Sequence, residues 1–345
     1  MTTLPPLLAP DRRRFLGGAA SAASALALGA TAAVAPARAA APMLGRGAPP
    51  WYRFKLGEFE ATVVTDGALP LGAPRAAFPA SPPADVEGLL RGAFLPTDGI
   101  VLEQNALVVN TGRHLVLFDT GMGDSMGEAS RMFGPTTGRL LRNLRAAGIE
   151  PSQIDLVALT HAHCDHCWAL VDANGDRNFP NAQVALAEAD LRFWTDDANK
   201  RGPAFMVPFI EGAKKNLVPY RDRMVMARDG AEVVPGITAI ASPGHTVGHH
   251  CYAVTSGGRT VVNTGDLAHH QVLLLRRPGW EFAYDGDPAG SARTRARLLD
   301  RFATDRHEIL SYHFPWPGLG NVARRAGEDG YDWVPAPMDV TSLNG

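Results

Sequence analysis

The sequence contains few cysteines. Only three of its 345 residues are cysteine, namely Cys164, Cys167 and Cys251. A small odd number does not describe a disulfide framework. The spacing of Cys164 and Cys167 is also that of a redox pair. However, Asp165 and His166 stand between these two cysteines, which favours metal chemistry over disulfide exchange.

The chain also lacks a strong excess of either charge. Its formal net charge is −2, with 20% charged and 46% hydrophobic residues. This composition is that of a globular protein, and it excludes a disordered chain and a nucleic-acid binder with a strongly basic face. Beyond the first forty residues we find no low-complexity segment, no clear repeat and no domain boundary. We therefore predict one domain over residues 50–345.

The first forty residues differ from the rest of the chain. Arginines at positions 12–14 precede Phe15 and Leu16, then a stretch rich in Ala, Gly and Ser, and finally the small-x-small pattern at 37–39. This order predicts an export signal over residues 1–40, of the twin-arginine type. The alternatives are a general secretory signal and a membrane anchor, and so many small residues disfavour the anchor. We therefore expect recognition by the twin-arginine export machinery, a periplasmic or secreted location, and no stable membrane insertion after cleavage.

Short apolar runs alternate with helical patterns along the remaining chain. The runs rich in Val, Leu and Ile predict strands at 59–66, 107–110, 115–119, 155–160, 183–187, 237–241, 251–255, 260–263 and 308–312. Helical spacing of apolar residues predicts helices within 134–148, 188–196 and 288–303. The arrangement suggests layered sheets with helices outside.

The segment THAHCDHC, residues 160–167, concentrates side chains that bind metals. His161 and His163 directly follow a predicted strand, and residues two apart in an extended segment point the same way. They can therefore bind one ion together, while Asp165 and His166 lie just beyond and can face a second ion. Neutral imidazole and carboxylate are the ligands expected for zinc or a similar first-row metal.

Three further candidate ligands follow other predicted strands. These are His245 in SPGHTVGHH after strand 237–241, Asp266 in VVNTGDLAHH after strand 260–263, and His313 in LSYHFPWPG after strand 308–312. If the strands lie side by side, these residues converge on the segment 160–167. The alternative is a set of unrelated polar residues, which the combined spacing disfavours.

Together these motifs resemble the metallo-β-lactamase superfamily. The matching elements, in family order, are His161-x-His163-x-Asp165-His166, Pro243-Gly244-His245-Thr246, Gly265-Asp266 and His313. The resemblance implies an α/β fold of the αβ/βα four-layer sandwich type, with two mixed sheets, helices outside and a two-metal site between the sheets. It assigns His161, His163 and His245 to one ion, Asp165, His166 and His313 to the other, and Asp266 to both as a bridge. Asp119, in LVLFDTG, also matches a family element and is expected to support the site.

Longer segments are similar to the methyl parathion hydrolase and lactonase-like branch. They are FGPTTGRLLRNLRAAG, SPGHTVGH and SYHFPWPGLG. Asp266 stands where class B β-lactamases commonly place a cysteine ligand, which argues against a dedicated β-lactamase. Relatives usually carry small residues where this chain has Trp168, so a bulky indole would narrow the pocket or reshape a loop. We predict Phe133, Trp168, Trp194 and His269 as pocket residues, with core packing as the alternative for the aromatic ones.

The predicted function is that of a dinuclear metal-dependent hydrolase. Two divalent ions, Zn²⁺ first and Mn, Fe or Co as alternatives, would hold a hydroxide that attacks a lactone, ester, phosphotriester or similar small molecule. Asp266 would fix the metal spacing, and Asp165 would orient the hydroxide and carry a proton. The alternatives are a mononuclear iron thiol-handling oxygenase on the same fold and a non-enzymatic periplasmic metal-binding protein. We expect no nucleic-acid partner, and the oligomeric state stays open, with a homodimer as one option.

Overall fold

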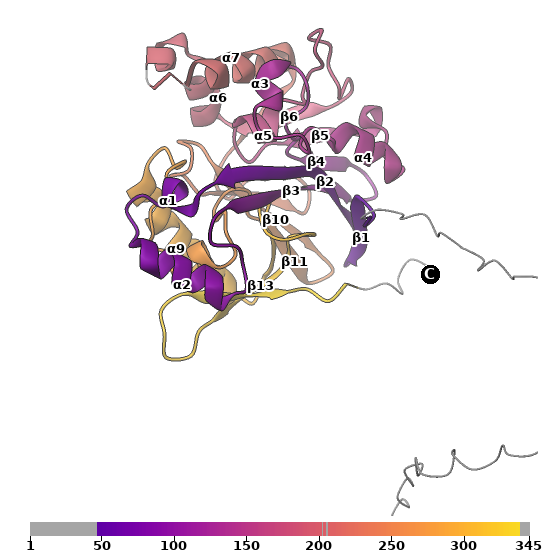
Figure 1. Ribbon diagram of the computed structural model, residues 1–345. Coiled ribbons are helices and arrows are strands. Elements are labelled where there is room, and N and C mark those ends of the chain that lie inside the picture. Colours follow the sequence, from indigo (N-terminus) through magenta and orange to yellow (C-terminus); the bar gives the residue numbers. More distant parts are fainter. Residues whose placement is uncertain (1–46, 202, 205, 339–345) are drawn as a thin grey trace, which may run out of the picture. The chain divides into compact units, whose positions relative to one another are not determined.

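The strands of the protein form two mixed sheets. The computed structural model, drawn in Figure 1, describes residues 47–201, 203–204 and 206–338. Within these residues each sheet has seven strands. The predicted export signal, residues 1–40, lies outside the described residues and stays a prediction. In the described part of the chain, no helix has both the length and the apolar character needed to cross a bilayer.

The first sheet is built in sequence order. Its strands are β1 (Trp51–Leu56), β2 (Phe59–Gly72), β3 (Ile100–Asn110), β4 (Leu115–Phe118), β5 (Leu156–Ala158), β6 (Gln183–Ala187) and β7 (Met224–Ala227). Strands β1 to β4 pair antiparallel, whereas β4 to β7 pair parallel.

The second sheet runs in reverse order from β14 to β8. Its strands are β14 (Tyr331–Pro335), β13 (Leu319–Arg324), β12 (Glu308–Leu310), β11 (Arg259–Asn263), β10 (His250–Ser256), β9 (Ile237–Ala241) and β8 (Glu232–Val234). Here β11 and β12 pair parallel, and the other neighbours pair antiparallel.

Alternating side chains divide the core into layers. Along β3, Leu107 and Val109 belong to the cluster between the two sheets, while Ala106 and Val108 pack with helices on the outer face. In the inner cluster Phe118 of the first sheet meets Tyr252 of the second, with ring centroids 5.4 Å apart. This period of two is what a strand buried on both faces requires.

Helices cover the outer face of each sheet. The cluster outside the first sheet includes α3 (Glu128–Arg131), α4 (Leu140–Ala146), α5 (Cys164–Cys167), α6 (Glu188–Thr195) and α7 (Met206–Leu217). The cluster outside the second includes α1 (Pro74–Ala77), α2 (Pro83–Gly92), α8 (Leu273–Arg276) and α9 (Pro288–Thr304). The described residues also form three short 3₁₀ helices, η1 (Pro151–Gln153), η2 (Asp197–Arg201) and η3 (Val218–Arg223). The predicted αβ/βα four-layer sandwich is confirmed.

Several predicted elements are shorter than the observed ones. Strand 59–66 continues to Gly72, because Gly67 and Gly72 take up register shifts as bulges instead of ending the strand. Strand 107–110 begins already at Ile100, since Gln104 and Asn105 are buried polar residues that interrupt the apolar pattern without ending the ladder. Strands β1, β7, β8, β13 and β14 were not predicted.

Candidate metal centre

Two parallel strand pairs bring the candidate ligands to one place. In the first sheet β4 and β5 are parallel, and Asp119 follows β4 while residues 160–166 follow β5. In the second sheet β11 and β12 are parallel, and Asp266 follows β11 while His313 follows β12. Because parallel strands end at the same edge of a sheet, each pair delivers its side chains together. The loop between β9 and β10 adds His245 at the same edge.

The first group of side chains surrounds a common point. His161, His163, His245 and Asp266 each offer one ligand atom, and these atoms lie within 4.8 Å of one another. Nε2 of His245 is 2.8 Å from Nδ1 of His163 and 3.2 Å from Oδ2 of Asp266. Nε2 of His161 lies 3.8 Å from the same Asp266 oxygen.

The second group lies against the other side of Asp266. Ligand atoms of Asp165, His166 and His313 also fall within 4.8 Å of one another. Oδ2 of Asp165 is 3.5 Å from Nε2 of His166 and 3.6 Å from Nε2 of His313. Oδ1 of Asp266 lies 3.2 Å from Nε2 of His166, and its Oδ2 lies 3.3 Å from Nε2 of His313. All seven residues predicted as ligands therefore come together, with Asp266 between the two groups.

Unpartnered nitrogen atoms test whether a metal fits here. Within the described residues, Nε2 of His161 and Nε2 of His166 are fully buried and make no hydrogen bond, and the carboxylate oxygens near Nε2 of His166 lie outside hydrogen-bond geometry. A buried polar atom without a partner destabilises a fold by about 1–3 kcal/mol, so native proteins rarely contain one. Coordination of a cation would satisfy both nitrogen atoms, and the donor set of imidazoles and carboxylates suits Zn²⁺.

Burial and neighbouring charges shift the pKa values of the candidate ligands. Burial, together with neighbouring imidazoles, holds the pKa of His161 and of His163 well below the usual value. Burial alone would raise the pKa of Asp266, but the surrounding imidazoles hold it well below its usual range. Burial would lower the pKa of His166, yet Asp266, Asp165 and Asp119 raise it well above the ordinary value. Metal ions bind neutral imidazoles and ionised carboxylates, so bound cations would displace the protons that neighbouring carboxylates favour on His166 and on His245, whose pKa Asp266 and Asp285 raise to about 9.

Buried partners orient the imidazoles. Oδ2 of Asp119 lies 3.0 Å from Nδ1 of His166, so the expected support from Asp119 is present as a direct contact. Asp119 has a φ of 60°, and the backbone N–H of Thr160 donates to its Oδ1 at 2.8 Å. The backbone N–H of Asp266 donates to Nε2 of His249 at 3.0 Å. His249 therefore fixes the loop of the central carboxylate, although it belongs to neither ligand group.

A second orienting contact was missed by sequence reasoning. Nδ1 of His245 lies 2.9 Å from Oδ1 of Asp285, and Nη2 of the buried Arg295 donates to Oδ2 of Asp285 at 2.9 Å. Asp285 stands in the loop before α9 and Arg295 stands within α9, where no motif marks either residue. The spacing of 40 residues between His245 and Asp285 left no local signal.

The four predicted pocket residues differ in their distance from the ligands. The ring of Trp194 meets that of His163 edge to face at 5.0 Å, and Nε2 of His269 lies 2.9 Å from Oδ2 of Asp266. The ring of Phe133 meets that of Trp168 edge to face, with ring centroids 6.2 Å apart. Trp168 itself is fully buried in the core cluster outside the first sheet, where Phe133 packs against it.

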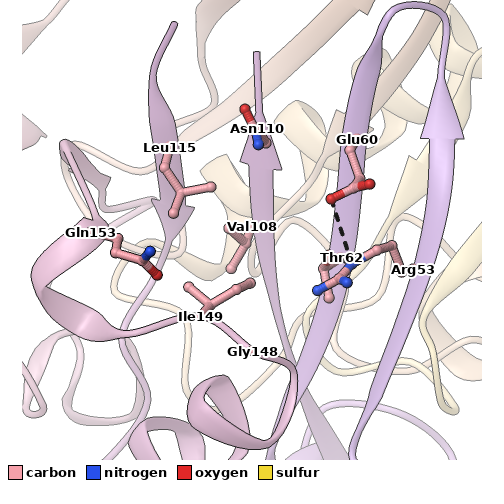
Figure 2. A pocket seen from close by; sticks show the side chains of 9 residues that line it. All are labelled: Arg53, Glu60, Thr62, Val108, Asn110, Leu115, Gly148, Ile149 and Gln153. Carbon is pink, nitrogen blue, oxygen red and sulfur yellow. Dashed lines mark hydrogen bonds and ion pairs between the residues drawn. The ribbon is translucent and has the colours of Figure 1, made fainter. Parts of the chain in front are cut away.

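A cavity of about 210 Å³ lies elsewhere on the first sheet (Figure 2). It is lined by Arg53, Glu60, Thr62, Val108, Asn110, Leu115, Gly148, Ile149 and Gln153. Leu115 begins β4, so this cavity lies at the opposite end of the strand from Asp119. Arg53 is already held there by Glu60 at 3.6 Å and by the carbonyl of Ala147 at 2.7 Å. The cavity is thus separate from the candidate metal centre.

Comparison with known proteins assigns the family. The model of the metallo-β-lactamase superfamily matches residues 99–313, and the chain belongs to this superfamily. A probable metallo-hydrolase of Mycobacterium tuberculosis is 27% identical over 239 residues, covering 64% of this chain and 74% of the relative. An N-acyl homoserine lactonase of Bacillus thuringiensis is 25% identical over 167 residues, covering 45% and 59%.

Solved structures agree with this assignment. The hydrolase AbOPH of the β-lactamase superfamily superposes with a TM-score of 0.78 at 29% identity, covering 85% of this chain and 100% of AbOPH. AidC, a dizinc quorum-quenching lactonase, superposes with a TM-score of 0.76 at 28% identity, covering 84% of this chain and 98% of AidC. Family, relatives and structural neighbours identify the chain as a metal-dependent hydrolase.

Proposed function

We propose that the protein is a dinuclear hydrolase that opens lactones or cleaves similar small esters. The observation that carries this proposal is the position of Asp266, whose carboxylate lies between two complete groups of ligand atoms. A carboxylate shared by two sites is suited to hold two cations at a fixed separation. The likeness to AidC, a dizinc lactonase, supports a lactone as the substrate class.

The seven candidate ligands would divide as the resemblance implies. His161, His163 and His245 would hold one ion, Asp165, His166 and His313 the other, and Asp266 both. Zn²⁺ is the first choice, because imidazole nitrogen and carboxylate oxygen are its usual ligands. Two bound cations would supply Lewis acidity, which lowers the pKa of water and polarises a carbonyl group.

The remaining chemistry belongs to side chains of the chain itself. Oδ2 of Asp165 faces the imidazoles of His166 and His313, whereas its Oδ1 accepts a weak hydrogen bond from the Cys164 thiol at 3.9 Å. Oδ1 is the atom that would accept a proton and pass it to the leaving oxygen. Burial lowers the pKa of His269 to about 4, so its imidazole is neutral, and its Nε2 would orient the carboxylate of Asp266. Trp194, packed against His163, would exclude water from one side of the substrate.

The test combines metal analysis with a substrate panel. The purified protein should contain two zinc equivalents and hydrolyse lactones in preference to aryl esters, phosphotriesters and β-lactams. A chelator should abolish hydrolysis and added Zn²⁺ should restore it. Asp266→Ala should lose hydrolysis together with metal, whereas His114→Ala, remote from the site in a turn before β4, should retain both.

Two results would favour the other functions. A single iron per chain with turnover of thiols would support the mononuclear oxygenase. Metal binding without hydrolysis of any substrate would support a metal-binding protein. The cysteines serve as a further check, because Cys164 and Cys167 are both buried and free. Hydrolysis should therefore survive replacement of either cysteine by serine.

We also propose that the protein is exported through the twin-arginine machinery. The proposal rests on the pattern of residues 12–16 and 37–39. Replacing Arg12 and Arg13 by lysine should retain the protein in the cytoplasm, as measured by fractionation of an expressing bacterium. Equal export of the wild type and the double variant would contradict the twin-arginine assignment.

A further inference from the structure

Helix α6 presents two residues to the first ligand group. Asp190 and Trp194 are four positions apart, so they lie on the same face of the helix. Trp194 contacts the ring of His163. Asp190 is fully buried, and it lies beside the backbone of Ala162 and of Gly248, in the two loops that carry the histidine ligands. Neither the motif pattern nor the family resemblance assigns a role to Asp190.

The carboxylate of Asp190 joins the two loops that supply the first ligand group. Its Oδ2 accepts from the backbone N–H of Ala162 at 3.1 Å and from Oγ1 of Thr246 at 3.0 Å. Its Oδ1 accepts from the backbone N–H of Gly248 at 2.7 Å. Ala162 stands between His161 and His163, whereas Thr246 directly follows His245. One side chain therefore fixes the backbone beside His161 and His163 and beside His245, which lies 82 residues after His163 in the chain.

The buried carboxylate of Asp190 is stabilised by hydrogen bonds and not by an ion pair with lysine or arginine in the described part of the chain. In the described part of the chain, no lysine or arginine forms an ion pair with it, although it is completely buried. A buried carboxylate without a cationic partner disfavours folding, and an apolar residue at this position on α6 would avoid that penalty. An apolar residue could not accept the three hydrogen bonds that the carboxylate of Asp190 accepts from two separate loops.

The close approach of the His245 loop to α6 requires a glycine. A Cβ on Gly248 would lie 2.7 Å from the backbone nitrogen of Asp190 and 3.0 Å from the Cβ of Ala187. Real Cβ atoms do not come that near to a backbone atom, so an alanine at this position would move the loop away from the helix. The backbone of the loop thus rests directly on α6, at the point where Asp190 accepts its hydrogen bond.

We propose that Asp190 is a positioning residue that sets the metal affinity of the group formed by His161, His163 and His245. The inference rests on the dinuclear function proposed above. Ligands from two loops form a tight site only when both loops keep their separation within a fraction of an ångström. Residues that orient ligands in this way typically change metal affinity by about 10–100-fold when they are replaced. The second ligand group has its own support from Asp119 and should not depend on Asp190.

Competition with a chromophoric chelator tests the proposal. Metal-free wild type and variants are titrated with Zn²⁺, and the affinities of the two equivalents are resolved. Asp190→Ala should weaken one equivalent by about 10–100-fold and leave the other within about threefold. The weakened equivalent should be the one that His163→Ala loses. Asp190→Asn should be intermediate, because its carbonyl oxygen retains one acceptor.

Two further variants separate positioning from general stability. Gly248→Ala perturbs the same contact from the loop side and should reproduce the loss at the same equivalent. Glu188→Gln changes an exposed ion pair with Arg192 on the same helix and should leave both affinities unchanged. Thermal unfolding of each metal-free variant is measured in parallel. Should Asp190→Ala not fold, Asp190→Asn and Gly248→Ala test the same contact.

The outcomes distinguish the proposals. Unchanged affinity of both equivalents in Asp190→Ala and Gly248→Ala would overturn the role of Asp190. Equal weakening of both equivalents, in proportion to a loss of thermal stability, would overturn it as well. If the wild type binds only one ion, the dinuclear function fails, and the role of Asp190 is judged on that ion by the same comparison.

Discussion

The buried guanidinium of Arg295 allows a quantitative prediction. Arg295 lies on α9 and is fully buried, which is rare for an arginine. Its nitrogen atoms donate to three backbone carbonyls and two side chains: Leu267 at 2.9 Å, Pro278 at 3.1 Å, Trp280 at 2.8 Å, Asp285 at 2.9 Å and Ser291 at 3.1 Å. These contacts hold the segment between Asp266 and α9, which carries the partner of His245. Arg295→Met would retain much of the volume but none of the donors.

The expected loss follows from the ion pair. Breaking a buried pair by removing one partner destabilises a protein by about 3–5 kcal/mol, because the other charge stays buried without compensation. In this variant Asp285 would be left with only His245, and three carbonyls would lose a donor. We therefore expect the free energy of unfolding to fall by at least about 3 kcal/mol. At roughly 2 °C per kcal/mol for a domain of this size, the midpoint should fall by about 6–10 °C.

Urea unfolding of the metal-free protein measures this loss. Arg297→Met, an exposed arginine on the same helix, is the matched control and should stay within about 0.5 kcal/mol of the wild type. The double variant Asp285→Asn with Arg295→Met should recover part of the loss, because no uncompensated charge remains. A loss below about 1 kcal/mol for Arg295→Met, or no recovery in the double variant, would refute this account of the pair.

Three further predictions address packing, thiol chemistry and metal support. Gly212→Ala should lose about 1–3 kcal/mol in urea unfolding, because its Cβ would clash with the Trp168 indole, while Gly88→Ala, with open space in α2, should gain up to about 1 kcal/mol. Equal effects of these two changes would contradict the packing. Burial raises the pKa of Cys251 to about 12 and those of the other two thiols well above normal, so Ellman's reagent should detect no thiol in the native protein and three after unfolding. Asp119→Asn should weaken one zinc equivalent at least about tenfold in chelator competition, and unchanged affinity would remove its supporting role.

The convergence of the candidate ligands could be predicted because each motif is local. In the segment 160–167 the side chains that meet are neighbours in sequence, and the other three candidates each follow a strand. The residues that orient them were not predictable in this way. Asp190 meets partners 28, 56 and 58 residues away, and Arg295 lies 28 residues from Leu267. Such contacts depend on tertiary packing, which leaves no periodic signal in the chain.

Errors in the strand boundaries have a related cause. The apolar pattern of β2 is interrupted at Asp66, and that of β3 at Gln104. The carboxylate of Asp66 accepts from the backbone N–H groups of Met122, at 2.9 Å, and of Leu140, at 2.7 Å. It thereby anchors both ends of the loop that carries Phe133. The interruptions of the pattern thus mark positions where a strand holds a loop of the site instead of packing the core.

Four buried carboxylates around the candidate metal centre each hold a loop or an imidazole in place. Asp66 holds the loop of Phe133, Asp119 orients His166, Asp190 joins the two loops of the first ligand group, and Asp285 orients His245. Of these four, only Asp285 has an arginine within ion-pair distance in the described part of the chain. Buried acids of this kind weaken the folded state of a metal-free chain, and an apolar core would be more stable. Their arrangement is explained by what they hold: each fixes a loop or an imidazole at the edge where the two sheets meet. We therefore expect the metal-free fold to be less stable than one with apolar residues at these positions. Bound cations would restore part of that stability, because they bind the folded state.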